Sequence, residues 1–207
     1  AGINGGNLVI YGCSSSGTMG QLDGGIAGAY AANNGNVTCK YCWTTGTIQA
    51  FAGGIFGDYA GVIGSASAIN CYTTGSVGNS AGGIFGRYAG TDGSATAQNC
   101  YSNGNVDTDG GGIFGVGAGT NAGFTIASNC YSSGIITTSN RGIYATGKVN
   151  GTESNCYVAN GFWTDTGANI KLTGVPINGK VGNTWVSTSI NTPYLLNSFG
   201  YTPYSLT

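Results

Sequence analysis

The 207-residue chain contains 41 glycines but only six Lys or Arg and seven Asp or Glu, and its net charge is −1. No basic cluster is present to bind nucleic acid, and the 41 % of hydrophobic residues argues against intrinsic disorder. No apolar run approaches the ~18 residues that a membrane-spanning helix needs.

Cysteines recur at a nearly constant interval along most of the chain. With Cys39 set aside, the intervals between successive cysteines are 29, 29, 29, 30 and 26. The recurring cysteines are Cys13, Cys42, Cys71, Cys100, Cys130 and Cys156. Asn precedes most of them, and a Gly-Gly-Ile triplet recurs in the same register. Internal periodicity of roughly 20 to 50 residues is typical of solenoids, propellers and other repeat architectures.

Short segments within each repeat predict strands and tight turns. Stretches such as 66–69 and 83–86 are bounded by Gly, Asn or Ser and contain no proline, and no apolar pattern of helical period is found. Twenty-nine residues at ~3.3 Å each are enough for one coil of two or three strands, but are few for the blade of a propeller, the main alternative. We therefore predict an all-β fold, a parallel β-solenoid (β-helix) of about six coils with ~29 residues per coil.

The solenoid is expected over residues 1–163, and residues 164–207 are expected to form an irregular C-terminal coil or cap. Stacked coils place equivalent residues ~4.8 Å apart, where like charges repel and Asn, aromatic and aliphatic side chains stack favourably. The recurring glycines are expected to supply corners with positive φ and to let neighbouring backbones approach closely.

The repeat unit is similar to that of a known family. The segments NCYTTGSVGNSAGGIFGRYAG and NCYSNGNVDTDGGGIFGVGAG resemble the GLUG-type repeat of secreted and surface-exposed bacterial proteins, including adhesin-like ones. The resemblance covers residues 24–157 and implies a surface scaffold that brings no catalytic residues. The fifth repeat departs from it, because Ile143-Tyr144-Ala145 replaces Ile-Phe-Gly.

The cysteine column has two interpretations. Cα atoms ~4.8 Å apart would permit disulfides between coils, and they would equally permit a column of inward-facing free thiols. The sequence leaves both open. A single C-x-x-C, from Cys39 to Cys42, has neither a second pair nor a histidine, which favours a structural role over a zinc or redox site.

An aromatic residue follows each cysteine from the second repeat onward: Trp43, Tyr72, Tyr101, Tyr131 and Tyr157. If the thiols face inward, strand alternation sends these rings outward as a continuous strip, which suggests a lateral or carbohydrate-binding surface. A corner at the preceding Asn would instead turn the rings inward. Both orientations stay open.

The charged residues do not suggest a catalytic site. The carboxylates are dispersed, and the chain lacks histidine, the commonest general base and metal ligand. Asp58 and Arg87 occupy one position in adjacent repeats, which predicts a surface ion pair. Asp107 and Asp109 are expected in a solvated turn rather than in a calcium site. We therefore expect no catalytic residues, no metal site, no cofactor and no enzymatic activity.

Hydroxyl side chains recur beside the aromatic column. Thr45 with Thr47 and Thr74 with Ser76 resemble the threonine arrays of ice-binding solenoids, but this regularity fails in the next repeat. An ice-binding function is accordingly the least favoured of the binding functions considered.

Three features of the chain bear on where it acts. Asn36 and Asn150 begin N-glycosylation sequons, which matter only in a chain secreted by a glycosylating cell. The chain starts at Ala1 without an initiator Met, which suits a processed secreted product or a fragment. We expect an extracellular, cell-surface or virion-surface location.

The leading hypothesis for function follows from the open ends of a solenoid. Such ends expose unpaired strand edges that can accept another copy, and charged residues that would prevent this are scarce here. The sequence therefore predicts a non-enzymatic structural subunit of an extracellular or surface fibre, whose main partner is itself, in a homo-oligomer or filament. The alternative is an adhesin-type module that binds surface glycans through the aromatic strip. Neither hypothesis involves nucleic acid or a membrane span.

Overall fold

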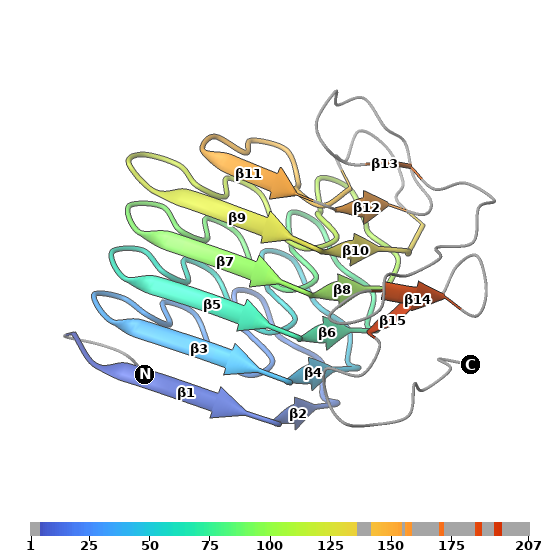
Figure 1. Cartoon of the computed structure of the whole chain (residues 1–207), viewed down its shortest axis with the longest axis horizontal. Helices are drawn as coiled ribbons and strands as arrows, with labels where there is room; N and C mark the ends of the chain where they lie inside the picture. Colours follow the sequence, from blue (N-terminus) through green and yellow to red (C-terminus); the bar gives the residue numbers. More distant parts are fainter. Residues whose placement is uncertain are drawn as a thin grey trace.

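The computed structural model describes residues 5–135, 142–154 and 156–158, together with three short strands nearer the C-terminus. Strands, turns and bends make up the described residues, and none of this part of the chain is helical. Parallel strands from successive coils lie side by side in two sheets (Figure 1). The prediction of an all-β parallel β-solenoid is confirmed.

One sheet, the long-strand sheet, takes one strand of four or five residues from each coil. Its strands in order are β1 (Asn7–Tyr11), β3 (Asn36–Lys40), β5 (Ser65–Ile69), β7 (Ser94–Gln98), β9 (Phe124–Ser128) and β11 (Gly151–Ser154). Strand β1 therefore lies at one edge of this sheet and β11 at the other (Figure 1).

The other sheet, the short-strand sheet, is built from two-residue strands. Its members are β2 (Ser14–Ser15), β4 (Trp43–Thr44), β6 (Tyr72–Thr73), β8 (Tyr101–Ser102), β10 (Tyr131–Ser132), β12 (Tyr157–Val158) and β13 (Ile170–Lys171). Strands β14 (Trp185–Ser187) and β15 (Pro193–Leu195) pair with each other, antiparallel. The predicted boundary at residue 163 lies outside the described residues, and β13 pairs with β12 beyond it.

The register between coils follows the sequence period. Asn7 pairs with Asn36 at the common interval of the repeat, whereas Ser94 pairs with Phe124, one residue beyond that interval. Thr125 pairs with Gly151, three residues short of it. The loops absorb these differences because a slip of one residue in a strand would turn its inner side chains to the outside.

The core consists of columns of like side chains along the rod. One column consists of the fully buried rings of Phe56, Phe85, Phe114 and Tyr144. The ring centroids of successive members are 4.9, 4.9 and 4.7 Å apart. A second column, of Ile55, Ile84, Ile113 and Ile143, is equally buried. Burial of each such side chain contributes about 1.5–3 kcal/mol, so these two columns provide much of the stability of the rod.

Asparagine supplies the corner before Cys71, Cys100 and Cys130, whereas Gly12 and Tyr41 hold the corresponding place before Cys13 and Cys42. Asn70, Asn99 and Asn129 have φ values of 55°, 53° and 52°. Asn tolerates this left-handed conformation better than most residues do. The Nδ2 atom of Asn99 donates to Oδ1 of Asn70 at 3.0 Å, and Asn129 donates to Asn99 at 3.1 Å. The same residues therefore turn the chain and join neighbouring coils.

The recurring glycines serve both expected roles, but most of them lie where backbones come close. Gly61, Gly90 and Gly119 are among those with positive φ. A Cβ atom at Gly82 would overlap the carbonyl oxygen of Phe85 and the amide nitrogen of Gly115 in the next coil. Gly28, by contrast, has open space around its Cα atom. The glycine pairs are thus required for the spacing between coils.

Substitution Gly82→Ala should destabilise the solenoid by about 1–3 kcal/mol, because the methyl group must displace backbone atoms of two coils. Gly28→Ala should be neutral or stabilise by up to about 1 kcal/mol, since it only restricts the unfolded chain. Urea-unfolding midpoints of the two variants and of the native chain measure the difference. Equal midpoints for the two variants would contradict the assigned role of Gly82.

Candidate functional site

The cysteines are free thiols, and six of the seven are buried. Only Cys13 is exposed. The Sγ atom of Cys71 donates to the carbonyl oxygen of Ile69, two residues earlier, and to that of Cys39 in the preceding coil, both at 3.4 Å. The same arrangement recurs at Cys100, Cys130 and Cys156. Of the two arrangements that the sequence left open, the structure contains the thiol column.

The environment of the buried thiols makes them unreactive. Burial raises the pKa of the Cys71, Cys100 and Cys130 thiols above the ordinary value of 9.0. A protonated thiol is neither a nucleophile nor a metal ligand. Cys39 lies outside the column, in the long-strand sheet, where it pairs with Ala68. Within the described residues, no three His, Cys, Asp or Glu side chains come together in a way that could hold a metal ion.

The aromatic residues after the cysteines lie on the outer side of the short-strand sheet. Cys42 and Thr44 are buried on its inner side, and Trp43 between them is only half-buried. Tyr72 is likewise half-buried, but the column is not exposed along its whole length. Tyr101 and Tyr131 are 4 % and 0 % exposed. The side chain of Tyr157 lies outside the described part of the structure.

These rings stack along the axis of the rod. The planes of Trp43 and Tyr72 are within 7° of parallel with centroids 6.0 Å apart, and those of Tyr72 and Tyr101 are within 1° at 4.9 Å. Stacking covers the ring faces and leaves only ring edges toward the outside. A sugar packs against an aromatic face. Trp43 stands at the first-coil end of this stack, where its neighbour in register is Ser14 rather than another ring.

A shallow groove runs beside this column across three coils. Its volume is about 350 Å³, and it is lined by Thr47, Ile48, Ser76, Val77, Gly78, Asn105, Val106 and Asp107. The exposed column at its rim changes from Thr47 to Ser76, Asn105 and Ile135. The groove wall is largely apolar, with Ile48, Val77 and Val106, and the exposed column beside it varies from coil to coil, so the surface is not the flat threonine array of an ice-binding protein.

The ion pair expected between adjacent coils is present, but its carboxylate is buried rather than at the surface. The Nε and Nη2 atoms of Arg87 donate to the two carboxylate oxygens of Asp58 at 3.2 and 3.1 Å. Asp58 is only 2 % exposed. Burial raises the pKa of the Asp58 carboxyl, and the guanidinium of Arg87 opposes that shift.

Aromatic rings surround the same guanidinium. Its central carbon lies 4.4 Å from the centroid of the Phe51 ring and 5.0 Å from that of Tyr88. Tyr88 belongs to a second ring column, with Tyr59 at 5.0 Å and Tyr30 a further 5.2 Å beyond. The Arg87 guanidinium meets a carboxylate at its edge and rings at its faces, and the cluster thereby joins adjacent coils.

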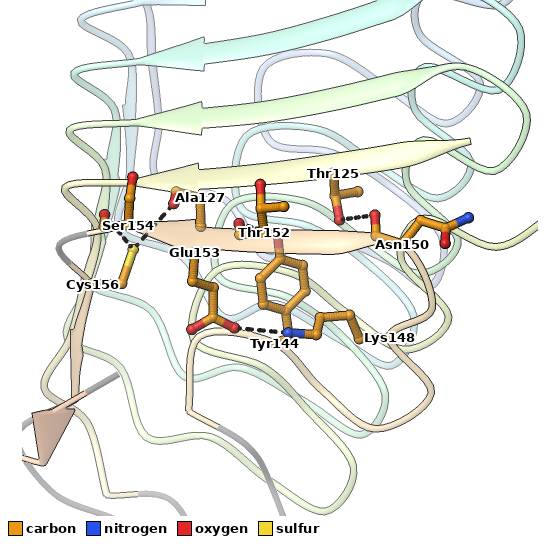
Figure 2. Close-up of polar contacts among 9 residues, drawn as sticks. All are labelled: Thr125, Ala127, Tyr144, Lys148, Asn150, Thr152, Glu153, Ser154 and Cys156. Carbon is orange, nitrogen blue, oxygen red and sulfur yellow. Dashed lines mark hydrogen bonds and ion pairs between the residues drawn. The ribbon is translucent and has the colours of Figure 1, made fainter. Parts of the chain in front are cut away.

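Sequence reasoning missed a polar cluster at the last described coil. Glu153 pairs in register with Ala127, so its side chain lies on the inner side of β11, in the column of small buried residues. Lys148 reaches it with Nζ 3.3 Å from Oε1 and lies 4.8 Å from the centroid of the Tyr144 ring (Figure 2). The shortened interval between Cys130 and Cys156 and the replacement of Ile-Phe-Gly by Ile143-Tyr144-Ala145 were the signals in the sequence that this coil differs.

Both predicted glycosylation residues are exposed, but their amide nitrogens are engaged. Nδ2 of Asn36 donates to Oδ1 of Asn7 at 2.7 Å. Nδ2 of Asn150 donates to the carbonyl oxygens of Asn121 and Gly123 at 3.2 and 3.1 Å. Attachment of a glycan would have to break these bonds or precede folding. Glycosylation stays a prediction from the sequons.

Comparison of the chain with protein-family models, curated proteins and solved structures finds no match. Similarity to the GLUG-type repeat therefore rests on the motif alone. No helix long and apolar enough to cross a membrane occurs among the described residues. What the molecule does has to be argued from its geometry.

Cys13 is expected to react with a thiol reagent in the folded chain, while the six buried cysteines react only on unfolding. Burial blocks the reagent at all six and raises the pKa of the Cys71, Cys100 and Cys130 thiols. Titration with a chromogenic disulfide under native conditions, and then in denaturant, counts the two classes. Rapid reaction of more than one thiol in the native chain would contradict the buried column.

Alkaline solution should destabilise the solenoid. Burial holds the pKa of Cys100 and Cys130 in the folded chain above 9.0, and burial likewise raises the pKa of Tyr144 above 10.0. The unfolded chain therefore loses these protons first as the pH rises above about 9, so the free energy of unfolding falls with pH.

Urea-unfolding midpoints between pH 7 and pH 10.5, measured with a reductant present, test this expectation. Below about pH 8 the thiols and phenols are protonated in both states and the midpoint should be flat with respect to them. A variant with Cys100→Ala should decline less steeply. A midpoint that stays constant or rises up to pH 10.5 contradicts the prediction.

Proposed function

We propose that the chain is a non-enzymatic structural subunit that self-associates into an extracellular or surface fibre. The observation that carries this proposal is the free strand edge at one end of the rod. Strand β1 is the terminal strand of the long-strand sheet, and no other described strand pairs with its outer edge. A row of unpaired backbone amides and carbonyls is a template for a further strand.

The use of the polar side chains supports a structural role. The repeated Asn, Cys and aromatic columns make contacts from coil to coil, and so does the Asp58–Arg87 pair. Such side chains stabilise a rod and leave few groups free to act on a substrate. The resemblance to the GLUG-type repeat of secreted proteins supports placing the fibre outside the cell.

A glycan-binding adhesin is the second candidate, and Trp43 is the residue that favours it. This ring is half-buried, has Ser14 rather than another ring as its neighbour in the first coil, and lies in the same coil as the exposed Thr47 at the groove. The stacked and buried rings farther along the column offer no second platform. A sugar would therefore contact one aromatic face only, which favours the structural proposal.

Electron microscopy of the purified chain over a dilution series tests the fibre proposal. A single solenoid of about six coils is on the order of 30 Å long, so longer rods that increase with concentration are expected. Sedimentation velocity on the same samples gives the corresponding increase in mass. Single, uniform particles at every concentration would rule the proposal out.

A further inference from the structure

Four of the eight large apolar side chains that are exposed among the described residues lie in the coil that holds β1. Val9 and Tyr11 are 61 % and 68 % exposed on the outer face of β1, and Leu22 and Tyr30 in the same coil are 39 % and 52 % exposed. A single exposed apolar residue is ordinary on a protein surface, but four in one coil form a candidate interface.

The inner face of this coil is apolar as well. Leu8 and Ile10 on β1 and Ile26 in the following turn are only partly buried and pack against the core. Their counterparts one coil further, such as Val37 and Cys39, are completely buried. The core of the solenoid therefore continues to the surface at this end, and β1 is apolar on both of its faces.

Charge distinguishes the two ends of the described solenoid. Residues 5–35 contain a single charged side chain, that of Asp23. The last long strand, β11, instead directs Glu153 inward, where it pairs with Lys148. The side chains of Lys148 and Glu153 are 18 % and 5 % exposed. An inward-pointing charge on the last strand is a known way to prevent strand addition, so an apolar coil does not match this end.

A copy of the same chain therefore meets a matching surface at the β1 end and a mismatched one at the β11 end. We propose that two copies join at their β1 ends, with β1 pairing antiparallel to its copy about a two-fold axis at Val9. This inference rests on the proposed self-association and names the surface that joins two copies. A fibre built from such pairs requires a further contact elsewhere on the rod. Two identical ends that face each other form a closed, isologous contact.

Strand geometry is compatible with this pairing. With Val9 opposite its own copy, Leu8 lies opposite Ile10 of the other chain and Asn7 lies opposite Tyr11. Side chains alternate with a period of two, so each pair stays on one face of the joined sheet. The inner residues Leu8 and Ile10 then cover each other, and the long-strand sheets of the two copies become one.

Substitution of Val9 by a charged residue tests the inference, because the two-fold axis places this side chain against its copy in the other chain. Val9→Glu and Val9→Lys should each raise the dissociation constant of the pair at least about tenfold through like-charge repulsion. An equimolar mixture of the two variants should restore association through opposite charges. Ile63→Glu is the matched control, since Ile63 is also 61 % exposed but lies between the ends of the rod.

Sedimentation equilibrium of each variant and of the mixture gives the dissociation constants, and circular dichroism confirms that the variants fold. A native chain that stays monomeric overturns both this inference and the fibre proposal. Association that is unaffected by charge at Val9 overturns only the inference and leaves self-association standing. Association lost in both variants but not restored in their mixture indicates a head-to-tail contact, which also overturns the two-fold pairing.

Discussion

Parallel stacking of equivalent residues at about 4.8 Å is the constraint on which the rest of the structure depends. At this distance a residue meets its own counterpart, so a column is stable only if its members attract one another or at least do not repel. The buried phenylalanines and isoleucines satisfy this condition by packing, and Asn70, Asn99 and Asn129 satisfy it by hydrogen bonds between their side chains. The scarcity of charge follows from the same condition.

Two of the charges within columns have a partner of opposite sign. Asp58 and Arg87 take equivalent places in adjacent coils, and aromatic rings cover the faces of the guanidinium. At the last described coil, Glu153 takes an inner place and meets Lys148 from its own coil. The first pair joins two coils, whereas the second gives the end of the sheet a polar interior. The two ends of the rod thus differ chemically although the repeat is regular between them.

Periodicity made much of the fold predictable. The spacing of the cysteines identifies equivalent residues in successive coils. The short period restricts each coil to short strands. The register of β1 to β9 therefore follows from counting residues from one cysteine to the next. Orientation was less predictable. Whether Trp43 faces in or out depends on the backbone at the corner before Cys42, where Tyr41 has a φ of 56°. The inward place of Glu153 was hidden because its coil is shorter than the others.

The sequence by itself determined the columns. It shows which cysteines, asparagines and rings stack on one another, and that like charges cannot stack in this way. This is possible because a constant interval converts sequence position directly into position along the rod. Only the tertiary structure decided that the thiols are free, that Asp58 is buried, and that most recurring glycines serve close backbone contact rather than positive φ. These properties depend on how tightly the coils approach and which way each corner turns, and contacts between distant residues set both.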